Sequence, residues 1–551
     1  MATSWGQWNR ALGRVFTNPN LRRLQTAFAG AWVTDWAYMV ALGILAFRLG
    51  GALAVGVAGL ARMLPAAIVS PLSAFLGDRY RRNVVLLWVQ VVLAIALVGS
   101  WWAVVAHWPQ AALYALAGVT GICMTLFRAT VSALMPWLAR GAEELVASNV
   151  VAAMIEGLGT LVGPLVGGAV AASVTPQAVF LGAGILAFLG LGVVARISPE
   201  GQELRTAGHA RSGVVEEIRE GFRELRVNHD ARLVVLSFYG QAFVRGALNV
   251  FIVVGALGQL HMGPSGVGLL TAAVGAGSLA GSAAGLTLVG RRLGVPFALG
   301  LLLWGLPIAV LGIRASPTLA LVLLAIVGVG NALLDVSGFT LLQRLVPDAR
   351  LSRVMGIMMG GAVAAIGIGS IVTPGLISWL GLGGAMGAVG LLLVFLSIGE
   401  FPRLRRIDQA AGKPPPEIEL LGSVPMFAPL SVAATEYLAS SMRRVNVPAA
   451  TRVIEEGDAG DRFYLIAEGW FEVTTGGHHV ARLGPGSYFG EIALVRDVPR
   501  TASVTAGTEG RVYTIDRAAF VAALTGYEAS LSSAKESIER RLTELRGIAP
   551  E

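Results

Sequence analysis

Long apolar stretches alternate with short polar segments along most of this chain. About 20 apolar residues cross a bilayer as a helix, and twelve stretches of that length are predicted to do so. They cover residues 24–47, 53–76, 84–106, 111–134, 146–172, 177–195, 232–257, 266–289, 295–313, 318–341, 354–380 and 383–400. The pattern predicts a membrane all-α fold of twelve transmembrane helices in two six-helix halves, residues 1–195 (the N-half) and 232–402 (the C-half).

Two polar regions interrupt or follow the apolar stretches. Residues 196–231 form a central loop, in which 214–226 has helical periodicity and alternating charge, typical of a surface helix. Residues 403–423 are charged and then Pro-rich, as in a linker. Beyond it, 424–447 and 517–547 read as helical, and short alternating runs ending in Gly or Asp lie between them. This order predicts a helix/β-roll/helix domain over 424–547.

Composition and charge agree with a membrane protein. Of 551 residues, 55% are hydrophobic and only 14% charged, whereas soluble domains have about 25%. The net charge is +8; residues 425–551 hold 13 Lys/Arg and 16 Asp/Glu, or −3, so residues 1–424 carry +11. Because the excess lies in the apolar part, we attribute it to membrane orientation and expect no nucleic-acid partner.

The single cysteine, Cys123, predicts neither a disulfide nor a metal site.

The loop charges predict the orientation. Loops on the N-terminal side hold arginine clusters at 10–23, 79–82, 196–232, 291–292, 344–353 and 403–406, whereas those on the other side hold only Arg48 and Arg314. Positive loops stay in the cytoplasm. We therefore expect a multi-pass protein of the cell inner membrane, surrounded by lipid bilayer, with both termini cytoplasmic.

The two halves resemble each other in sequence. Pro136 and Pro347 lie in similar segments, as do Pro164 and Pro374, at offsets of 211 and 210 residues. A repeated six-helix half is typical of secondary transporters, whose substrate site lies between the halves. No phosphate-binding loop motif occurs, so ATP-driven transport is not indicated. No enzyme activity and no cofactor are expected.

Ionisable residues inside predicted spans are costly and indicate a functional path. Six are candidates for a substrate or proton pathway: Asp35, Arg62, Arg128, Glu156, Arg245 and Asp335. A carboxylate there is a candidate proton carrier, and the arginines are candidates for neutralising it or binding an anionic substrate. The alternative is a set of structural ion pairs, for example Arg62 with Glu156.

The loop after the second span, "AFLGDRYRRN" (74–83), resembles the loop motif between helices 2 and 3 of the major facilitator superfamily. Leu76, Asp78, Arg79 and Arg82 match that motif, whereas Ala74, Arg81 and Asn83 depart from it. The resemblance implies a conformational latch in which Asp78, Arg79 and Arg82 hold the halves together on the cytoplasmic side. An arginine cluster that only sets topology is the alternative.

The fifth span contains "GTLVGPLVGG" (159–168), which matches a pattern typical of exporters that exchange substrate for protons. The resemblance implies proton-coupled efflux of a small molecule, in a macrolide-efflux-like branch of the superfamily. Gly159 and Gly163 offer a flat packing face, and Pro164 removes a backbone hydrogen bond. Gly159, Gly163 and Pro164 are therefore assigned to the conformational latch together with Asp78, Arg79 and Arg82. The alternative is a general packing face of small residues.

The segment "FGEIALVRDVPRTASV" (489–504) resembles the phosphate-binding cassette of cyclic nucleotide-binding domains, and "EEGDAGDRFYLIAEG" (455–469) resembles their turn-and-strand signature. The resemblance implies that Arg500 pairs with the cyclic phosphate and that Glu491 accepts from the ribose hydroxyl. A short helix starting near Gly490 would point its N–H groups at the anion. The implied site is Gly490, Glu491, Ile492, Ala493, Arg500, Thr501 and Ala502.

Other features of this domain concern ligand choice and closure. The regulatory ligand is expected to be cAMP, and Thr501 also permits cGMP. The last helix is expected to act as a lid through Arg541, Leu542 and Leu545, and it is also a candidate homodimer contact. A roll that has lost its ligand and only mediates contacts is the alternative.

The sequence thus predicts a proton-coupled exporter regulated by a cyclic nucleotide. Three alternatives stay open: a membrane sensor with little net flux, a lipid flippase, and a metabolite importer of the same fold.

Overall fold

The computed structural model of the chain describes residues 15–70, 81–140, 142–197, 214–285, 293–410, 416–428 and 441–525, with short pieces at 430, 435, 438–439, 533–534 and 536–539. The chain divides into two compact units, Met1–Asp408 and Gln409–Glu551. Each unit has a hydrophobic core of its own.

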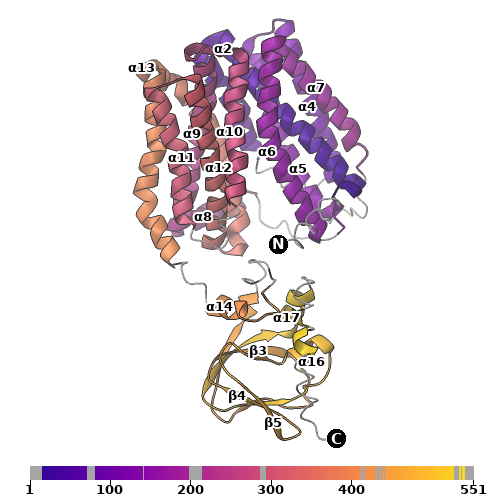
Figure 1. Ribbon diagram of the computed structural model, residues 1–551. Coiled ribbons are helices and arrows are strands. Elements are labelled where there is room, and N and C mark those ends of the chain that lie inside the picture. Colours follow the sequence, from indigo (N-terminus) through magenta and orange to yellow (C-terminus); the bar gives the residue numbers. More distant parts are fainter. Residues whose placement is uncertain are drawn as a thin grey trace. The chain divides into compact units, whose positions relative to one another are not determined.

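The first unit is a bundle of long apolar helices (Figure 1). Among the described residues, ten helices are long and apolar enough to cross a membrane. They are α2 (Pro19–Val69), α4 (Arg82–Val105), α5 (Gln110–Leu138), α6 (Ala142–Ser173), α7 (Pro176–Val194), α9 (His229–Val254), α10 (Gly263–Gly285), α11 (Gly294–Ile313), α12 (Pro317–Leu345) and α13 (Asp348–Ala410). A short π-helix, η1 (Gly255–Gln259), continues α9.

Two of these helices contain a break that turns the chain. In α2 the break lies at Gly50 and Gly51, and Gly51 has a φ of 63°. In α13 it lies at Gly381, with a φ of 70°. Side chains larger than glycine rarely adopt such positive φ angles. Both breaks fall where the sequence predicts a gap between spans, after residues 47 and 380, so α2 and α13 each cover two predicted spans. The total of twelve spans in two halves stays a prediction.

Helix α2 of the predicted N-half and helix α9 of the predicted C-half have the same capping arrangement. The Asn18 side chain accepts backbone N–H groups at the start of α2 and donates to Leu138 O at 2.9 Å. Asn228 likewise caps α9 and donates to Leu345 O at 2.8 Å. The offset between these asparagines is 228 − 18 = 210 residues, equal to one of the proline offsets. This pair was not identified from the sequence, and it supports the internal repeat.

The surface helix predicted over 214–226 is present as α8 (Val214–Val227). Glu224 pairs with Arg350, and Glu220 pairs with Arg353, both near the start of α13. Gly221 lets the helices approach, because a Cβ there would lie 3.2 Å from Arg353 O. Helix α8 is therefore attached to α13.

The second unit contains two four-stranded antiparallel sheets within its described residues. One has the order β1-β8-β3-β6 and the other β2-β7-β4-β5. The strands are β1 (Arg443–Val447), β2 (Arg452–Ile454), β3 (Arg462–Glu468), β4 (Phe471–Thr475), β5 (His478–Leu483), β6 (Tyr488–Phe489), β7 (Ser503–Ala506) and β8 (Gly510–Asp516). Three helices accompany them: α14 (Pro416–Gly422), α16 (Glu491–Arg496) and α17 (Arg517–Thr525).

The helix predicted over 424–447 is wrong at both ends, and residues 424–428 form turns rather than a helix. Residues 443–447 form β1, which pairs with β8 from Arg443–Thr514 to Val447–Gly510. Its sequence, RRVNV, has alternating polarity, and pairing with β8 outweighs the helical pattern of the residues before it. A cluster of Phe427, Phe463 and Phe520 joins β3 to α17, with ring centroids 4.9 to 5.9 Å apart.

Candidate functional site

The roll encloses a cavity of about 130 Å³. All seven residues predicted to form the ligand site line it: Gly490, Glu491, Ile492, Ala493, Arg500, Thr501 and Ala502. Seven apolar residues that were not predicted for the site also line it: Ile454, Val473, Val480, Ala481, Leu483, Phe489 and Val504. Alternation within strands was the only available signal for these residues. The lining of the roll cavity thus combines a buried arginine and a buried glutamate with apolar side chains.

Arg500 is the cation of the roll cavity, and it is only 5% exposed. Its guanidinium donates to Gly490 O at 2.9 Å and to Arg462 O at 2.8 Å, and it lies 3.4 Å from Asp461 Oδ1. Burial lowers the pKa of Arg500, while nearby Tyr464 and Asp461 act in the opposite direction. The side chain is therefore held in place and available to pair with an anion.

The segment before Arg500 places an acid beside it. Gly490 has a φ of 90° and caps α16, which begins at Glu491. A Cβ at Gly490 would lie 2.7 Å from Arg500 Nη1, so this position favours glycine for space as well as for conformation. The Glu491 side chain is 1% exposed. A buried carboxylate next to a buried guanidinium can accept from a ligand hydroxyl while the guanidinium binds an anionic group.

The predicted lid residues Arg541, Leu542 and Leu545 lie outside the described residues, so the lid stays a prediction. Two described residues of the C-terminal segment, Ala534 and Ile538, are buried, and Ala534 belongs to the core around Phe463 and Phe520. Part of the segment after α17 therefore packs on the roll's own helical core.

In the membrane unit, Arg62 pairs with Asp35. The alternative named from sequence was a set of structural ion pairs, and only its example, Arg62 with Glu156, is wrong. The reason is the break in α2, because the chain folds back there and brings residues 35 and 62 of one helix together. Arg62 lines a cavity of about 60 Å³ that it shares with Asn249 and Thr271 of the C-half.

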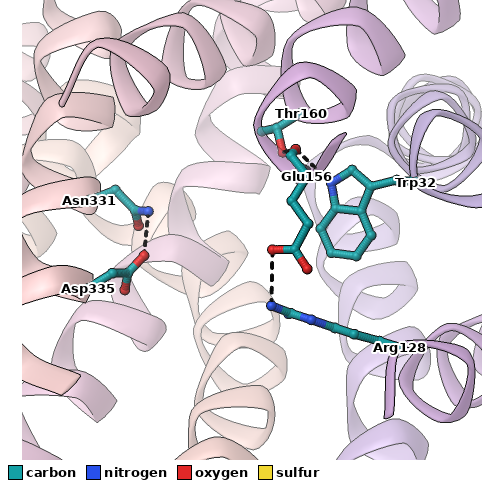
Figure 2. Close-up of polar contacts among 6 residues, drawn as sticks. All are labelled: Trp32, Arg128, Glu156, Thr160, Asn331 and Asp335. Atoms are coloured by element: carbon teal, nitrogen blue, oxygen red, sulfur yellow. Dashed lines mark hydrogen bonds and ion pairs between the residues drawn. The ribbon is translucent and has the colours of Figure 1, made fainter. Parts of the chain in front are cut away.

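Glu156 instead pairs with Arg128, Oε2 to Nη2 at 3.2 Å (Figure 2). Trp32 supports both residues. Its indole N–H donates to Glu156 O at 2.9 Å, and its ring lies 5.3 Å from the Arg128 guanidinium. The Arg128 side chain is 57% exposed. This N-half cluster therefore offers a cation and an acid that a solute can reach.

A second polar cluster lies on the C-half. Asn331 donates to Asp335 Oδ2 at 2.9 Å, and Gln241 donates to Asn331 Oδ1 at 3.3 Å. Figure 2 shows Asn331 and Asp335 on the opposite side of the view from Arg128 and Glu156. The charges of Arg245, Arg128 and Glu156 all act on Asp335. Four of the six predicted pathway residues therefore lie close enough to interact electrostatically. Two of them, Arg128 and Glu156, come from the N-half, and the other two, Arg245 and Asp335, come from the C-half.

The predicted latch is described only in part. Asp78 and Arg79 lie outside the described residues. Arg82 donates to Ala133 O at 2.8 Å and lies 5.6 Å from the Trp137 ring, so these two contacts stay within the N-half. The latch role of these three residues stays a prediction.

The glycine motif of α6 packs against two helices. A Cβ at Gly163 would lie 2.6 Å from Trp36 Cβ, and Gly159 faces Trp32, both on α2. At the end of the motif, a Cβ at Gly168 would lie 2.9 Å from Gly268 Cα on α10. Pro164 lies inside α6. The motif therefore gives close contact both within the N-half and with the C-half.

Replacing Gly163 with alanine is expected to lower the thermal unfolding temperature of the purified protein in detergent. The new methyl group meets Trp36 and Val33 O, and overpacking costs about 1–3 kcal/mol. Gly182→Ala in α7 is the matched control, because nothing lies within 4 Å of a Cβ there. Equal melting temperatures for the two variants would contradict close packing at Gly163.

The chain was compared with known families. The family model described as Major Facilitator Superfamily matches residues 26–294 and 234–446. The model described as Cyclic nucleotide-binding domain matches residues 444–527. The crystal structure of the nucleoside transporter NupG is similar with a TM-score of 0.58 at 11% identity, covering 71% of this chain and 100% of that one. This last likeness concerns the fold alone.

Two of the curated relatives that match do so over a minor part of the chain. A cAMP-dependent protein kinase regulatory subunit of Yarrowia lipolytica is 43% identical over 102 residues, or 18% of this chain. A cyclic nucleotide-gated potassium channel of Rhizobium etli is 31% identical over 160 residues, or 28% of this chain. The chain spans 27% and 43% of these two proteins, respectively.

Proposed function

The chain belongs to the Major Facilitator Superfamily and carries a C-terminal cyclic nucleotide-binding domain, and from this premise we propose that it is a secondary active transporter regulated by a cyclic nucleotide. It is a multi-pass membrane protein by its family and its apolar helices. We place it in the cell inner membrane with both termini in the cytoplasm, where a nucleotide made inside the cell reaches the roll.

One observation carries the regulatory part of the proposal. The roll cavity is lined by a buried arginine, a buried glutamate and several apolar side chains. A cyclic nucleotide has the matching parts, since it carries an anionic phosphate, a ribose hydroxyl and a flat base. The 43% identity to a regulatory subunit named for cAMP favours that nucleotide. Thr501 lines the cavity and keeps cGMP as the second ligand to test.

The transport part rests on the two polar clusters. Arg128 and Glu156 of the N-half and Asp335 of the C-half lie within electrostatic reach of one another inside the membrane unit. Ionisable groups in such positions mark substrate and proton routes. Together with the match of residues 159–168 to the exporter pattern, they support proton-coupled export of a small molecule.

Regulation requires that the nucleotide binds two states of the transporter with different affinity. The ligand shifts the balance between inward- and outward-facing states only by that difference, and the effect is reciprocal. A substrate that favours one state therefore changes the affinity for the nucleotide by the same factor.

Everted membrane vesicles test the proposal. A pH gradient is established across the vesicle membrane, and erythromycin is then added as the first substrate probe. The release of protons from the vesicles is followed with and without cAMP. We expect cAMP to change the rate of probe-dependent proton release in the wild type and to have no effect on a Glu491→Ala variant. Probe-dependent release that is identical with and without cAMP, despite cAMP binding measured by calorimetry, would contradict regulation.

A further inference from the structure

The last membrane helix ends on a buried acid. Asp408, near the end of α13, is only 3% exposed. Its Oδ1 accepts from Leu293 N and Gly294 N, both at 2.8 Å, and its Oδ2 accepts from Val295 N at 3.2 Å. These N–H groups open α11 and have no partner within that helix. The carboxylate also faces the positive end of the α11 dipole. Asp408 therefore fastens the end of α13 to the start of α11.

The junction around Asp408 leaves no spare room. A Cβ at Gly294 would lie 2.5 Å from Leu404 O and 3.0 Å from Asp408 Oδ2. Leu293 and Leu404 beside it are buried at 3% and 0% exposure. The two helix ends are thus in backbone contact, and a displacement of one is transmitted to the other.

A second acid of α13 reaches α9. The Ser237 hydroxyl, which is fully buried, donates to Glu400, eight residues before Asp408. One helical turn after Ser237, Gln241 donates to Asn331, which donates to Asp335. Polar contacts therefore join the last helix to α9, and α9 in turn to the polar cluster of the C-half. We call Glu400 and Asp408, with their partners on α9 and α11, the carboxylate clamp.

The carboxylate clamp lies at the exit of the chain from the membrane unit. The two compact units divide between Asp408 and Gln409. Only residues 409–415 separate Asp408 from α14, the first helix of the second unit.

We propose that the carboxylate clamp is the element through which the nucleotide-binding domain acts on the transporter, with Asp408 as a positioning residue. The inference rests on the proposed regulation by a cyclic nucleotide. In this mechanism, nucleotide binding displaces the chain after Asp408, and the carboxylate clamp makes α9 and α11 follow α13. A helix cap that serves only stability predicts something different, because its loss would lower the melting temperature and leave the nucleotide response intact.

Hydrogen–deuterium exchange of the purified full-length protein, with and without saturating cAMP, separates these cases without a known substrate. In the wild type, we expect cAMP to slow exchange in the cassette, residues 489–504, and to change exchange in the first turns of α9 and α11. In Asp408→Asn, the cassette response should persist and the response of α9 and α11 should be lost. Ser237→Ala, which frees Glu400, should weaken the α9 response.

Two control variants carry the same kind of change elsewhere. Asp230→Asn removes an exposed acid in the first turn of α9, and Glu144→Gln removes a buried acid that accepts from Asn18 in the N-half. Both should keep the full cAMP response. A wild-type-like response in Asp408→Asn, or a cassette response with none in α9 and α11 of the wild type, would overturn the inference. A wild type without any cassette response would instead refute the proposed function itself.

Discussion

An Arg500→Ala variant is expected to bind cAMP about 100-fold more weakly than the wild-type chain. Hydrogen bonds to charged groups contribute about 1.5–3 kcal/mol each, and each 1.4 kcal/mol is tenfold in affinity. Arg500 is buried and lines the roll cavity, where its two terminal guanidinium nitrogens donate to Gly490 O and Arg462 O. Two hydrogen bonds from this guanidinium to a bound phosphate, lost in the variant, account for the expected factor. Isothermal titration calorimetry of the full-length protein measures it directly.

Two further variants make the result specific. Arg500→Lys keeps the charge but not the planar fork, so an intermediate affinity is expected. Arg496→Ala removes an exposed arginine from the same segment and should leave binding unchanged. If Arg500→Ala bound cAMP as tightly as Arg496→Ala, the phosphate would not lie at Arg500 and the assignment of the roll cavity would fail.

An Asp35→Ala variant is expected to lose about 3–5 kcal/mol of stability, the usual cost of leaving one member of a buried ion pair alone. The partner, Arg62, has a side chain that is 5% exposed, and its Nε already lacks a hydrogen-bond partner within the described structure. Removing Asp35 leaves this charge unbalanced between the halves. Thermal unfolding of the purified protein in detergent should show a large drop in the midpoint.

The double variant Asp35→Asn, Arg62→Met should recover most of that loss, because replacing both members of a buried pair by well-packed neutral groups is often neutral. Glu156→Gln is the contrasting control, because its partner Arg128 is 57% exposed and stays hydrated. Its effect on stability should be small. A double variant no more stable than Asp35→Ala would show that the pair contributes by shape rather than by charge balance.

The ligand site of the roll could be predicted from sequence because it is nearly continuous in the chain. Residues 490–502 run through α16 to the start of β7, and local turn geometry at Gly490 sets their arrangement. The apolar lining comes from β2, β4, β5, β6 and β7, whose apolar residues carry no local mark of function. Strand β1 was predicted as helix because its strand conformation depends on pairing with β8, which lies more than 60 residues later in the chain.

The membrane unit shows the same limit. Apolar length predicted the long apolar helices and the gaps at which both breaks lie, since these depend on local sequence. Pairing among charges depends on which helices meet, and the mispairing of Arg62 followed from treating α2 as two unrelated spans. The caps at Asn18 and Asn228 were identifiable in principle, because each asparagine stands just before a long apolar run at the repeat offset.

The contact between Gly168 of α6 and Gly268 of α10 has a mechanical consequence. Backbone meets backbone there, and on the other boundary a Cβ at Gly56 of α2 would lie 2.5 Å from Ser370 O of α13. Interlocking side chains resist rotation, because each must leave one hole and enter another. Helix surfaces that present only backbone lack such interlocking side chains. At these two glycine contacts, the N-half and C-half therefore oppose a rocking motion less than interlocked side chains would. A single methyl group added at Gly168 or Gly56 would hinder that motion.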